Sequence, residues 1–129
     1  MVDARSITVT VLVVDDSVET RRRLAEMLVE QAMTCVMECP ARHAEVFDLL
    51  AGLTPDCVVI DVPVQNPAGF ELLASIRRAL PVCLMIALTN HFSESFRQRA
   101  FEVGADHCLA KSTEFERVAD LTRALREKT

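Results

Sequence analysis

The stretch VTVLVVDD, residues 9–16, decides the fold of this chain. Its unbroken run of apolar and β-branched residues indicates a strand buried on both faces, as in a parallel sheet. A second run, CVVI at residues 57–60, also ends in an acid, Asp61. Because parallel strands end at one edge of the sheet, we expect Asp15, Asp16 and Asp61 to converge there. Three neighbouring carboxylates repel one another unless a cation lies among them, so the pattern predicts a Mg²⁺ site with one carboxylate left to react.

The composition favours one globular domain. The chain has 129 residues, of which 50% are hydrophobic, enough for a real core and too apolar for disorder. A formal charge of −5 argues against binding to nucleic acid or to an anionic membrane surface. The sequence shows neither a signal peptide nor an apolar stretch of membrane-spanning length, so we expect a cytoplasmic protein with its five cysteines reduced.

Strand and helix patterns alternate along the whole chain, without a linker, a low-complexity tract or a repeat. Strands are predicted at residues 8–14, 33–39, 57–60, 82–88 and 107–110. Helices are predicted at about residues 17–31, 41–51, 70–80 and 93–103, and in a last segment that follows the fifth strand. This alternation defines the class as α/β, doubly wound, with five strands and five helices.

Several residues mark the predicted ends of the helices. Asp16 or Ser17 is expected to cap the first helix, and Ser93 or Ser95 the fourth. Pro40 suits the first turn of the second helix, and Gly104 is expected just beyond the end of the fourth. The pair Thr113 and Glu116 has the spacing of a capping box for the last helix. Residues 62–69 are predicted to form a loop.

The strand ends supply residue types that suit phosphoryl transfer. Mg²⁺ prefers hard oxygen ligands and typically takes one or two carboxylates plus water and phosphate oxygens. A further carboxylate can attack phosphorus and form an aspartyl phosphate. Lys111 would add positive charge around the transferred group, and the hydroxyl of Thr89 would bond to one of its oxygens.

These residues give the chain a resemblance to the receiver domain of bacterial two-component response regulators, over essentially its whole length. The resemblance rests on four segments in the order and spacing of that family: VLVVDDS at 11–17, VVID at 58–61, IALT at 86–89 and LAK at 109–111. It implies a flavodoxin-like sheet with strand order 2-1-3-4-5 and five flanking helices.

The resemblance also implies a role for each residue. Asp61 would be the phosphoacceptor, and Asp15, Asp16 and Asp61 would hold Mg²⁺ together with the backbone carbonyl of Pro63. Thr89 would contact the phosphoryl group, and Lys111 would pair with it. The phosphoryl group would come from a sensor histidine kinase or a histidine phosphotransfer protein.

Four departures from the family pattern concern the response to phosphorylation. The aromatic residue usual three places before the lysine is Cys108 here, and the proline usual after the lysine is Ser112. The loop after the acceptor reads Val-Gln at 64–65 and Ala-Gly at 68–69, where the family usually has Met-Pro and Asp-Gly. Pro63 still offers a carbonyl oxygen, so the metal site is expected to survive.

Three other features have simpler readings. Cys35, Cys39 and His43 are spaced four residues apart, but a strand followed by a helix with no fourth ligand predicts core cysteines, not a metal site. The run of three arginines at 21–23 is predicted to lie on a solvated helix face, with a partner contact as the second reading. His91 follows Thr89 by two residues, a position that tunes phosphorylation and dephosphorylation rates in the family. Its simpler reading is a lone loop histidine without a specific role.

The leading hypothesis is a single receiver domain over residues 1–129, a stand-alone response regulator without an output domain. It would catalyse only its own phosphorylation and dephosphorylation. It would be a monomer or weak dimer, and it would signal by contact with an unknown downstream protein or by onward phosphotransfer. The alternative is an interaction module that works without phosphorylation, suggested by Cys108 and Ser112. A haloacid-dehalogenase-type phosphatase lacks its Asp-x-Asp motif here, and three glycines in all exclude a glycine-rich nucleotide loop.

Overall fold

A five-stranded parallel sheet organises the chain, in a computed structural model that describes residues 8–31 and 33–127. The strands are β1 Val9–Val14, β2 Thr34–Cys39, β3 Cys57–Asp61, β4 Leu84–Thr89 and β5 His107–Ala110. The helices are α1 Val18–Val29, α2 His43–Leu50, α3 Pro67–Ala79, α4 Glu94–Glu102, α5 Lys111–Glu114 and α6 Arg117–Glu127. The strand order is β2-β1-β3-β4-β5, which confirms the predicted α/β class and the predicted order.

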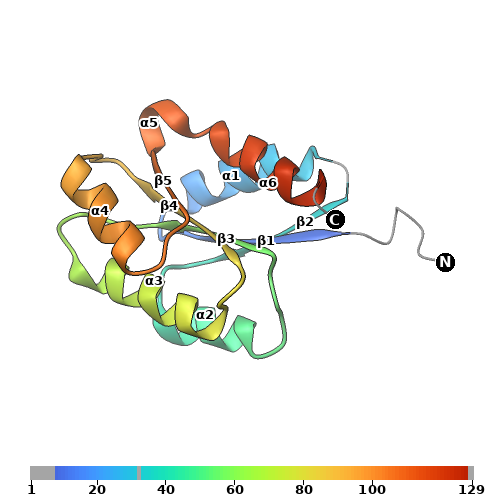
Figure 1. The fold of residues 1–129 in the computed structure, drawn as a ribbon. Helices are drawn as coiled ribbons and strands as arrows, with labels where there is room; N and C mark the ends of the chain where they lie inside the picture. The colour runs from blue at the N-terminus through green and yellow to red at the C-terminus, as the bar shows by residue number, and fades with distance from the viewer. Residues whose placement is uncertain (1–7, 32, 128–129) are drawn as a thin grey trace.

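Helices cover both faces of the sheet (Figure 1). α1 and α6 lie on one face, where Leu24, Leu28 and Val118 pack against it. α2, α3 and α4 supply the core on the other face. Because side chains alternate between the faces of a strand, Val11 and Val13 enter the first core, and Leu12 and Val14 enter the second. Burial on both faces is the reason why the strands read as continuous apolar runs.

Three of the predicted helix ends are confirmed. Ser17 caps α1 by accepting a hydrogen bond from the N–H of Thr20, and Ser93 caps α4 by accepting one from Phe96. Gly104 follows the C-cap of α4 with φ +124°, a left-handed conformation that side chains other than glycine's rarely adopt.

Two predicted helix starts were wrong. α3 begins at Pro67, three residues before the predicted start, because the side chain of Asn66 caps it by accepting from the N–H of Ala68 at 3.0 Å. Proline suits the first turn of a helix, so part of the predicted 62–69 loop is helical. α2 begins later than predicted, at His43, and Pro40 therefore lies outside its first turn.

Three strands begin later than predicted, β1 by one residue at Val9. β4 starts at Leu84, and Val82, expected inside it, is 97% exposed. Apolar character alone placed it in the strand, because periodicity cannot distinguish a strand from an apolar turn that precedes it. β2 starts at Thr34, since Met33 has φ 61° and so turns the chain before the strand.

The C-terminal segment holds the largest departure from the prediction. A short helix, α5, follows β5 directly, and a break at residues 115–116 separates it from α6. Six helices therefore lie among the described residues, where five were predicted. The capping box was wrong, because Thr113 lies inside α5; Glu114 reaches back instead and accepts from the N–H of Ala110 at 3.1 Å.

The arginine run on α1 is only partly solvated. Arg22 and Arg23 are exposed, but Arg21 packs inward, donating to the carbonyl of Asp15 at 2.9 Å and pairing with Glu38 at 3.3 Å. The guanidinium of Arg23 lies 4.8 Å from the ring centre of Phe115, so α1 also holds the segment after α5. The prediction of one solvated face was therefore wrong for Arg21.

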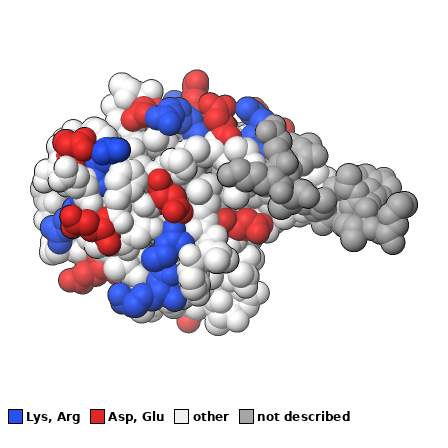
Figure 2. Space-filling model, viewed as in Figure 1, with Lys and Arg blue, Asp and Glu red and all other residues white. Residues whose placement is uncertain are grey.

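The surface carries charges of both signs. Acidic and basic side chains are interspersed over the face that Figure 2 shows. Among the described residues, no helix combines the length and the apolar character needed to cross a bilayer.

Candidate phosphoacceptor site

The end of β1 places Asp15 inside the molecule. Its side chain is buried, and both of its carboxylate oxygens are engaged: Oδ1 accepts from the N–H of Ser17 at 2.8 Å, and Oδ2 accepts from Nζ of Lys111 at 2.7 Å. The first bond forms a local turn that leads into α1. Asp15 is therefore held rigidly between its own loop and the lysine.

Asp61 is the last residue of β3 and faces the same lysine. Its Oδ1 accepts from Nζ of Lys111 at 2.8 Å, and its side chain is 17% exposed. Burial raises the pKa of Asp61, since it penalises the charged form, while the hydrogen bond from Lys111 opposes that shift. Among the described residues Oδ2 has no hydrogen-bond partner, which leaves one oxygen of Asp61 available for chemistry.

Lys111, the first residue of α5, joins two strand ends that are far apart in the sequence. Its side chain is 8% exposed and bridges Asp15 and Asp61. Burial alone would lower the pKa of Lys111, but the hydrogen bonds to the two carboxylates outweigh burial and raise it. The ammonium therefore keeps its charge at neutral pH and partly neutralises the acids around it.

Thr89 ends β4 at the same edge of the sheet. Its neighbour Leu88 pairs with Asp61 in the β3–β4 register, so the two strands end side by side. The side chain of Thr89 is almost fully buried, and its Oγ1 accepts from the N–H of His91 at 3.2 Å. The hydroxyl hydrogen has no partner among the described residues and remains free to donate.

A hollow of about 250 Å³ opens beside Asp61. Three of the predicted site residues line it, namely Asp16, Asp61 and Pro63. Asp15, Thr89 and Lys111 are not in its lining; Lys111 connects Asp15 to Asp61, which does line it. The structure thus brings the predicted residues to one edge of the sheet, divided between an open hollow and a buried bridge.

Four further polar residues, which the strand-end pattern did not predict, line this hollow. His43 comes from the start of α2, Asn66 from the loop before α3, and Glu71 and Ser75 from α3 itself. None of them follows a strand, which was the signal used for the others. Only the packing of α2 and α3 beside β3 places them there, so the sequence carried no signal for them.

The donor atoms fit a magnesium ion that retains several waters. Asp16, Asp61 and Pro63 line the hollow, and one oxygen each of Asp16 and Asp61 has no bond within the described part of the chain. The carbonyl oxygen of Pro63 accepts from the N–H of Asn66 at 3.3 Å and keeps a second lone pair. Over residues 8–31 and 33–127, no three His, Cys, Asp or Glu side chains are already gathered as a metal cage. Magnesium does not need one, because it binds through one or two carboxylates and completes its shell with water and phosphate.

An acidic pocket with a bridging lysine thus lies at the carboxyl edge of a 2-1-3-4-5 sheet, where doubly wound domains of the flavodoxin-like fold keep their sites. The family model for the response regulator receiver domain matches residues 11–123. The chain belongs to that family, and with it to the two-component signalling proteins.

Relatives and solved structures agree with this assignment. The chain is 32% identical over 123 residues to protein-glutamate methylesterase/protein-glutamine glutaminase 1 of Myxococcus xanthus, covering 93% of this chain and 35% of that protein. It is 28% identical to the response regulator protein VraR of Staphylococcus aureus, covering 90% of this chain and 56% of VraR. The chain therefore spans about a third and about half of these relatives.

Two solved structures share the fold. A response regulator from Thermotoga maritima has a TM-score of 0.82 at 21% identity, covering 94% of this chain and 99% of that one. A two-component response regulator of the LuxR family from Aurantimonas sp. SI85-9A1 has a TM-score of 0.81 at 25% identity, covering 95% of this chain and 87% of that one.

Proposed function

We propose that Asp61 accepts a phosphoryl group from a phosphohistidine on a sensor histidine kinase or a phosphotransfer protein. The observation that carries the proposal is the bridge from Lys111 to Asp15 and Asp61, at 2.7 and 2.8 Å, beside the open hollow. Receiver domains typically bind Mg²⁺ at the phosphorylation site and interact with kinases or phosphotransfer proteins. The free oxygen of Asp61 is the nucleophile.

The reaction transfers one phosphoryl group between two side chains. The free carboxylate oxygen of Asp61 attacks phosphorus, the phosphorus–nitrogen bond of the phosphohistidine breaks, and its electron pair leaves with the imidazole. Lys111, already hydrogen-bonded to Asp61, balances charge on the phosphoryl oxygens, and the Thr89 hydroxyl donates to one of them.

The metal ligands would be Asp16, Asp61 and the carbonyl of Pro63, with Asp15 as part of the acidic set. A bound Mg²⁺ supplies positive charge at the phosphoryl oxygens. Both carboxylate oxygens of Asp15 already accept hydrogen bonds, from the N–H of Ser17 and from Lys111. The main role of Asp15 beside the metal site would therefore be to hold Lys111 in place. The role of each residue stays a prediction that mutation tests.

The signal would leave the domain by a protein contact or by onward phosphotransfer. We propose that the domain acts in the cytoplasm as a monomer or weak dimer, without binding nucleic acid or membrane, and that it catalyses only its own phosphorylation and dephosphorylation. The five free cysteines support the cytoplasmic location, and the charge of −5 supports the absence of binding to nucleic acid and to anionic membrane.

An interaction module that works without phosphorylation is the second candidate. It is favoured by Cys108, which is buried in the core that includes Phe96 and Ala100 of α4, where the family usually places a movable aromatic ring. Burial raises the pKa of the Cys108 thiol to about 11, so at neutral pH it is a small neutral core group. Such a side chain has no large rotamer change with which to report phosphorylation.

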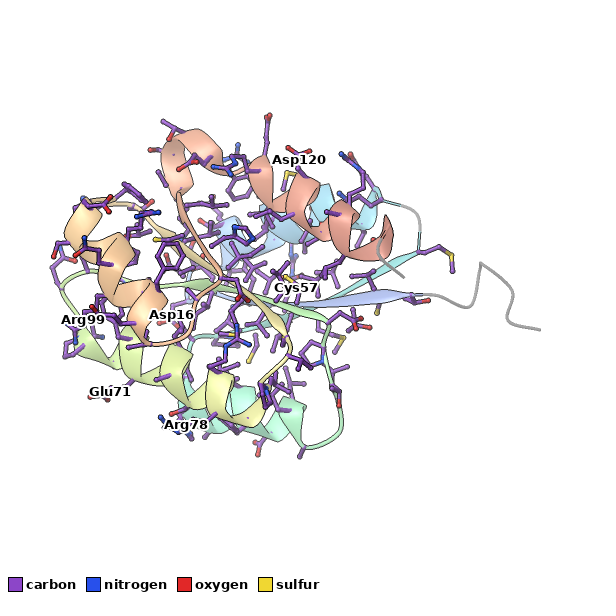
Figure 3. The ribbon with its side chains drawn as sticks, viewed as in Figure 1. Asp16, Cys57, Glu71, Arg78, Arg99 and Asp120 are labelled. Carbon is purple, nitrogen blue, oxygen red and sulfur yellow. The ribbon has the colours of Figure 1, made fainter. Side chains whose placement is uncertain are left out.

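Labelling with acetyl phosphate separates the two candidates. The parent protein should gain one phosphoryl group, measured by intact mass, in the presence of MgCl₂ and not in EDTA. Asp61→Asn should abolish labelling, while Asp120→Asn, the same chemical change on the exposed face of α6, should leave it unchanged (Figure 3). A parent protein that takes no label with Mg²⁺ would rule out the phosphoacceptor function and leave the second candidate.

A further inference from the structure

Asp16 is held in place by a backbone group from a distant loop. Its Oδ1 accepts a hydrogen bond from the N–H of Ala41 at 2.9 Å, across 25 residues of sequence. Asp16 lies in the loop between β1 and α1 and is exposed, so no packed element fixes its side chain. Among the described residues its Oδ2 has no hydrogen-bond partner. One oxygen of the carboxylate is thus anchored and the other stays open.

A tight turn makes the N–H of Ala41 available. The N–H of Arg42 donates to the carbonyl of Pro40 at 2.8 Å, which closes a three-residue turn with Ala41 at its centre. Proline has no N–H, and the N–H of Arg42 is used inside the turn, so Ala41 carries the one donor that the turn can direct outward. That donor meets Asp16, and Ala41 lines the same hollow as Asp16, Asp61 and Pro63.

We propose that the N–H of Ala41 is a positioning group for the cation site, fixing Asp16 so that its free oxygen faces the hollow shared with Asp61. The inference rests on the proposed Mg²⁺-dependent function and adds the β2–α2 turn to the site. A charge-assisted hydrogen bond orients the carboxylate before the metal arrives, which removes the entropy cost of ordering it on binding. Loss of such an outer partner typically weakens metal binding by about ten- to a hundredfold.

Two variants remove this N–H in different ways. Ala41→Pro suits the backbone, because the centre of such a turn has φ near −75° and the only non-glycine residue with positive φ in the described chain is Met33. Its ring, however, would also crowd the carboxylate. Replacement of the Ala41 residue by lactate, its hydroxy-acid analogue, converts the amide to an ester, which deletes the donor without changing a side chain and weakens the Pro40 carbonyl only as an acceptor for the N–H of Arg42. The same ester replacement at Ala51, the exposed C-cap residue of α2 outside the lining of the hollow, is the matched control.

The readout is the affinity for MgCl₂, measured by isothermal titration calorimetry without any phosphodonor. We expect the Ala41 ester and proline variants to bind Mg²⁺ about tenfold more weakly than the parent, and the Ala51 ester variant to bind as the parent does. Unfolding midpoints in EDTA identify any variant that fails to fold; the Ala41 ester variant then carries the test, because it changes no side chain.

Three results would count against the idea in different ways. An Ala41 ester variant that binds Mg²⁺ as tightly as the parent would show that the bond plays no part in the site. Tighter binding would show that Ala41 competes with the metal for Asp16. A parent protein that does not bind Mg²⁺ would instead overturn the proposed function itself, and this inference with it.

Discussion

At the scale of single residues, Asp61 is mostly buried and yet lines an open hollow. Its carboxylate is largely removed from water, lies near Asp15 and is only partly compensated by Lys111. An arrangement of this kind trades stability for reactivity, because a group that must react cannot have all of its charge satisfied by the protein.

Asp61→Asn should therefore stabilise the fold at neutral pH by about 1 kcal/mol. Burial raises the pKa of Asp61, so the folded protein keeps a proton on this carboxyl more readily than the unfolded chain does. Stability then falls as the pH rises from the ordinary carboxyl pKa through the raised value, and the full penalty is present at neutral pH. Urea unfolding in EDTA from pH 7.5 down to pH 4 should show the advantage of Asp61→Asn shrinking as the pH falls.

Asp120→Asn is the control for this measurement, because it makes the same chemical change at a side chain that is 70% exposed and paired with Arg123. Its effect should stay within about 0.5 kcal/mol at every pH. An Asp61→Asn protein that is no more stable than the parent at neutral pH would contradict the explanation by burial.

At the scale of elements, one arginine joins the end of α3 to the start of β4 and to the turn before β5. The guanidinium of Arg77 donates to the carbonyl of Gly104 at 2.9 Å and to Asp106 at 2.7 Å. It also donates to three carbonyls around the α3–β4 turn, those of Leu80, Pro81 and Cys83. The stem of Arg77 lies so close to Gly104 that a Cβ there would meet its Cγ at 2.6 Å. Glycine at position 104 therefore allows both the positive φ of the turn and the close approach of the Arg77 side chain.

Arg77→Ala should lower the free energy of unfolding by about 2–3 kcal/mol, because several partly buried carbonyls lose their donor at once. Arg77→Lys should recover little of this loss, since an ammonium lacks the planar fork that reaches all of these acceptors. Chemical denaturation measures both effects.

Arg78→Ala provides the neighbouring control (Figure 3). Arg78 is exposed and donates only to Oγ of Ser75 among the described residues, so its loss should cost less than about 0.5 kcal/mol. If the two alanine variants proved equally stable, Arg77 would be an ordinary surface residue and not the link between these elements.

At the scale of the whole molecule, the sheet is shared by two cores. Leu28 of α1 and Leu73 of α3 are both fully buried, on opposite faces of the same strands. A layer on either face loses its support when the sheet opens, so the domain should unfold as one cooperative unit.

Leu28→Ala and Leu73→Ala should each lower the free energy of unfolding by about 3 kcal/mol, the usual result of a cavity in a packed core. The native cysteines report the two faces separately: Cys57 belongs to the α1 side and Cys83 to the α3 side. Alkylation at increasing urea should show both thiols losing protection at the same denaturant concentration in each variant.

Val82→Ala is the matched aliphatic control, because Val82 is exposed and its truncation leaves no cavity. It should change stability by less than about 0.5 kcal/mol. Exposure of Cys57 well before Cys83 in Leu28→Ala, or the reverse order in Leu73→Ala, would show instead that the two cores unfold independently.

The sequence by itself determined the α/β class, the parallel sheet and the identity of the strand-end residues. These follow from local patterns, since apolar runs mark doubly buried strands and the residue after each run must emerge at the same edge. Caps such as Ser17 and Ser93 were readable for the same reason, because a cap bonds to backbone groups within three residues. The cap at Asn66 and the break after α5 were not predicted. Residues 62–69, with their two prolines and one glycine, resemble a loop, and Thr113 and Glu116 resemble the start of a single last helix.

Only the tertiary structure decided how these residues meet. The bridge of Lys111 to Asp15 and Asp61 and the bond from Ala41 to Asp16 join positions 25 to 96 residues apart. The position of His43 at the hollow was also decided by the tertiary structure, because it depends on how α2 packs beside the sheet. Such contacts depend on the register of the strands and the directions of the loops between them, and a periodic pattern in one segment carries no information about either.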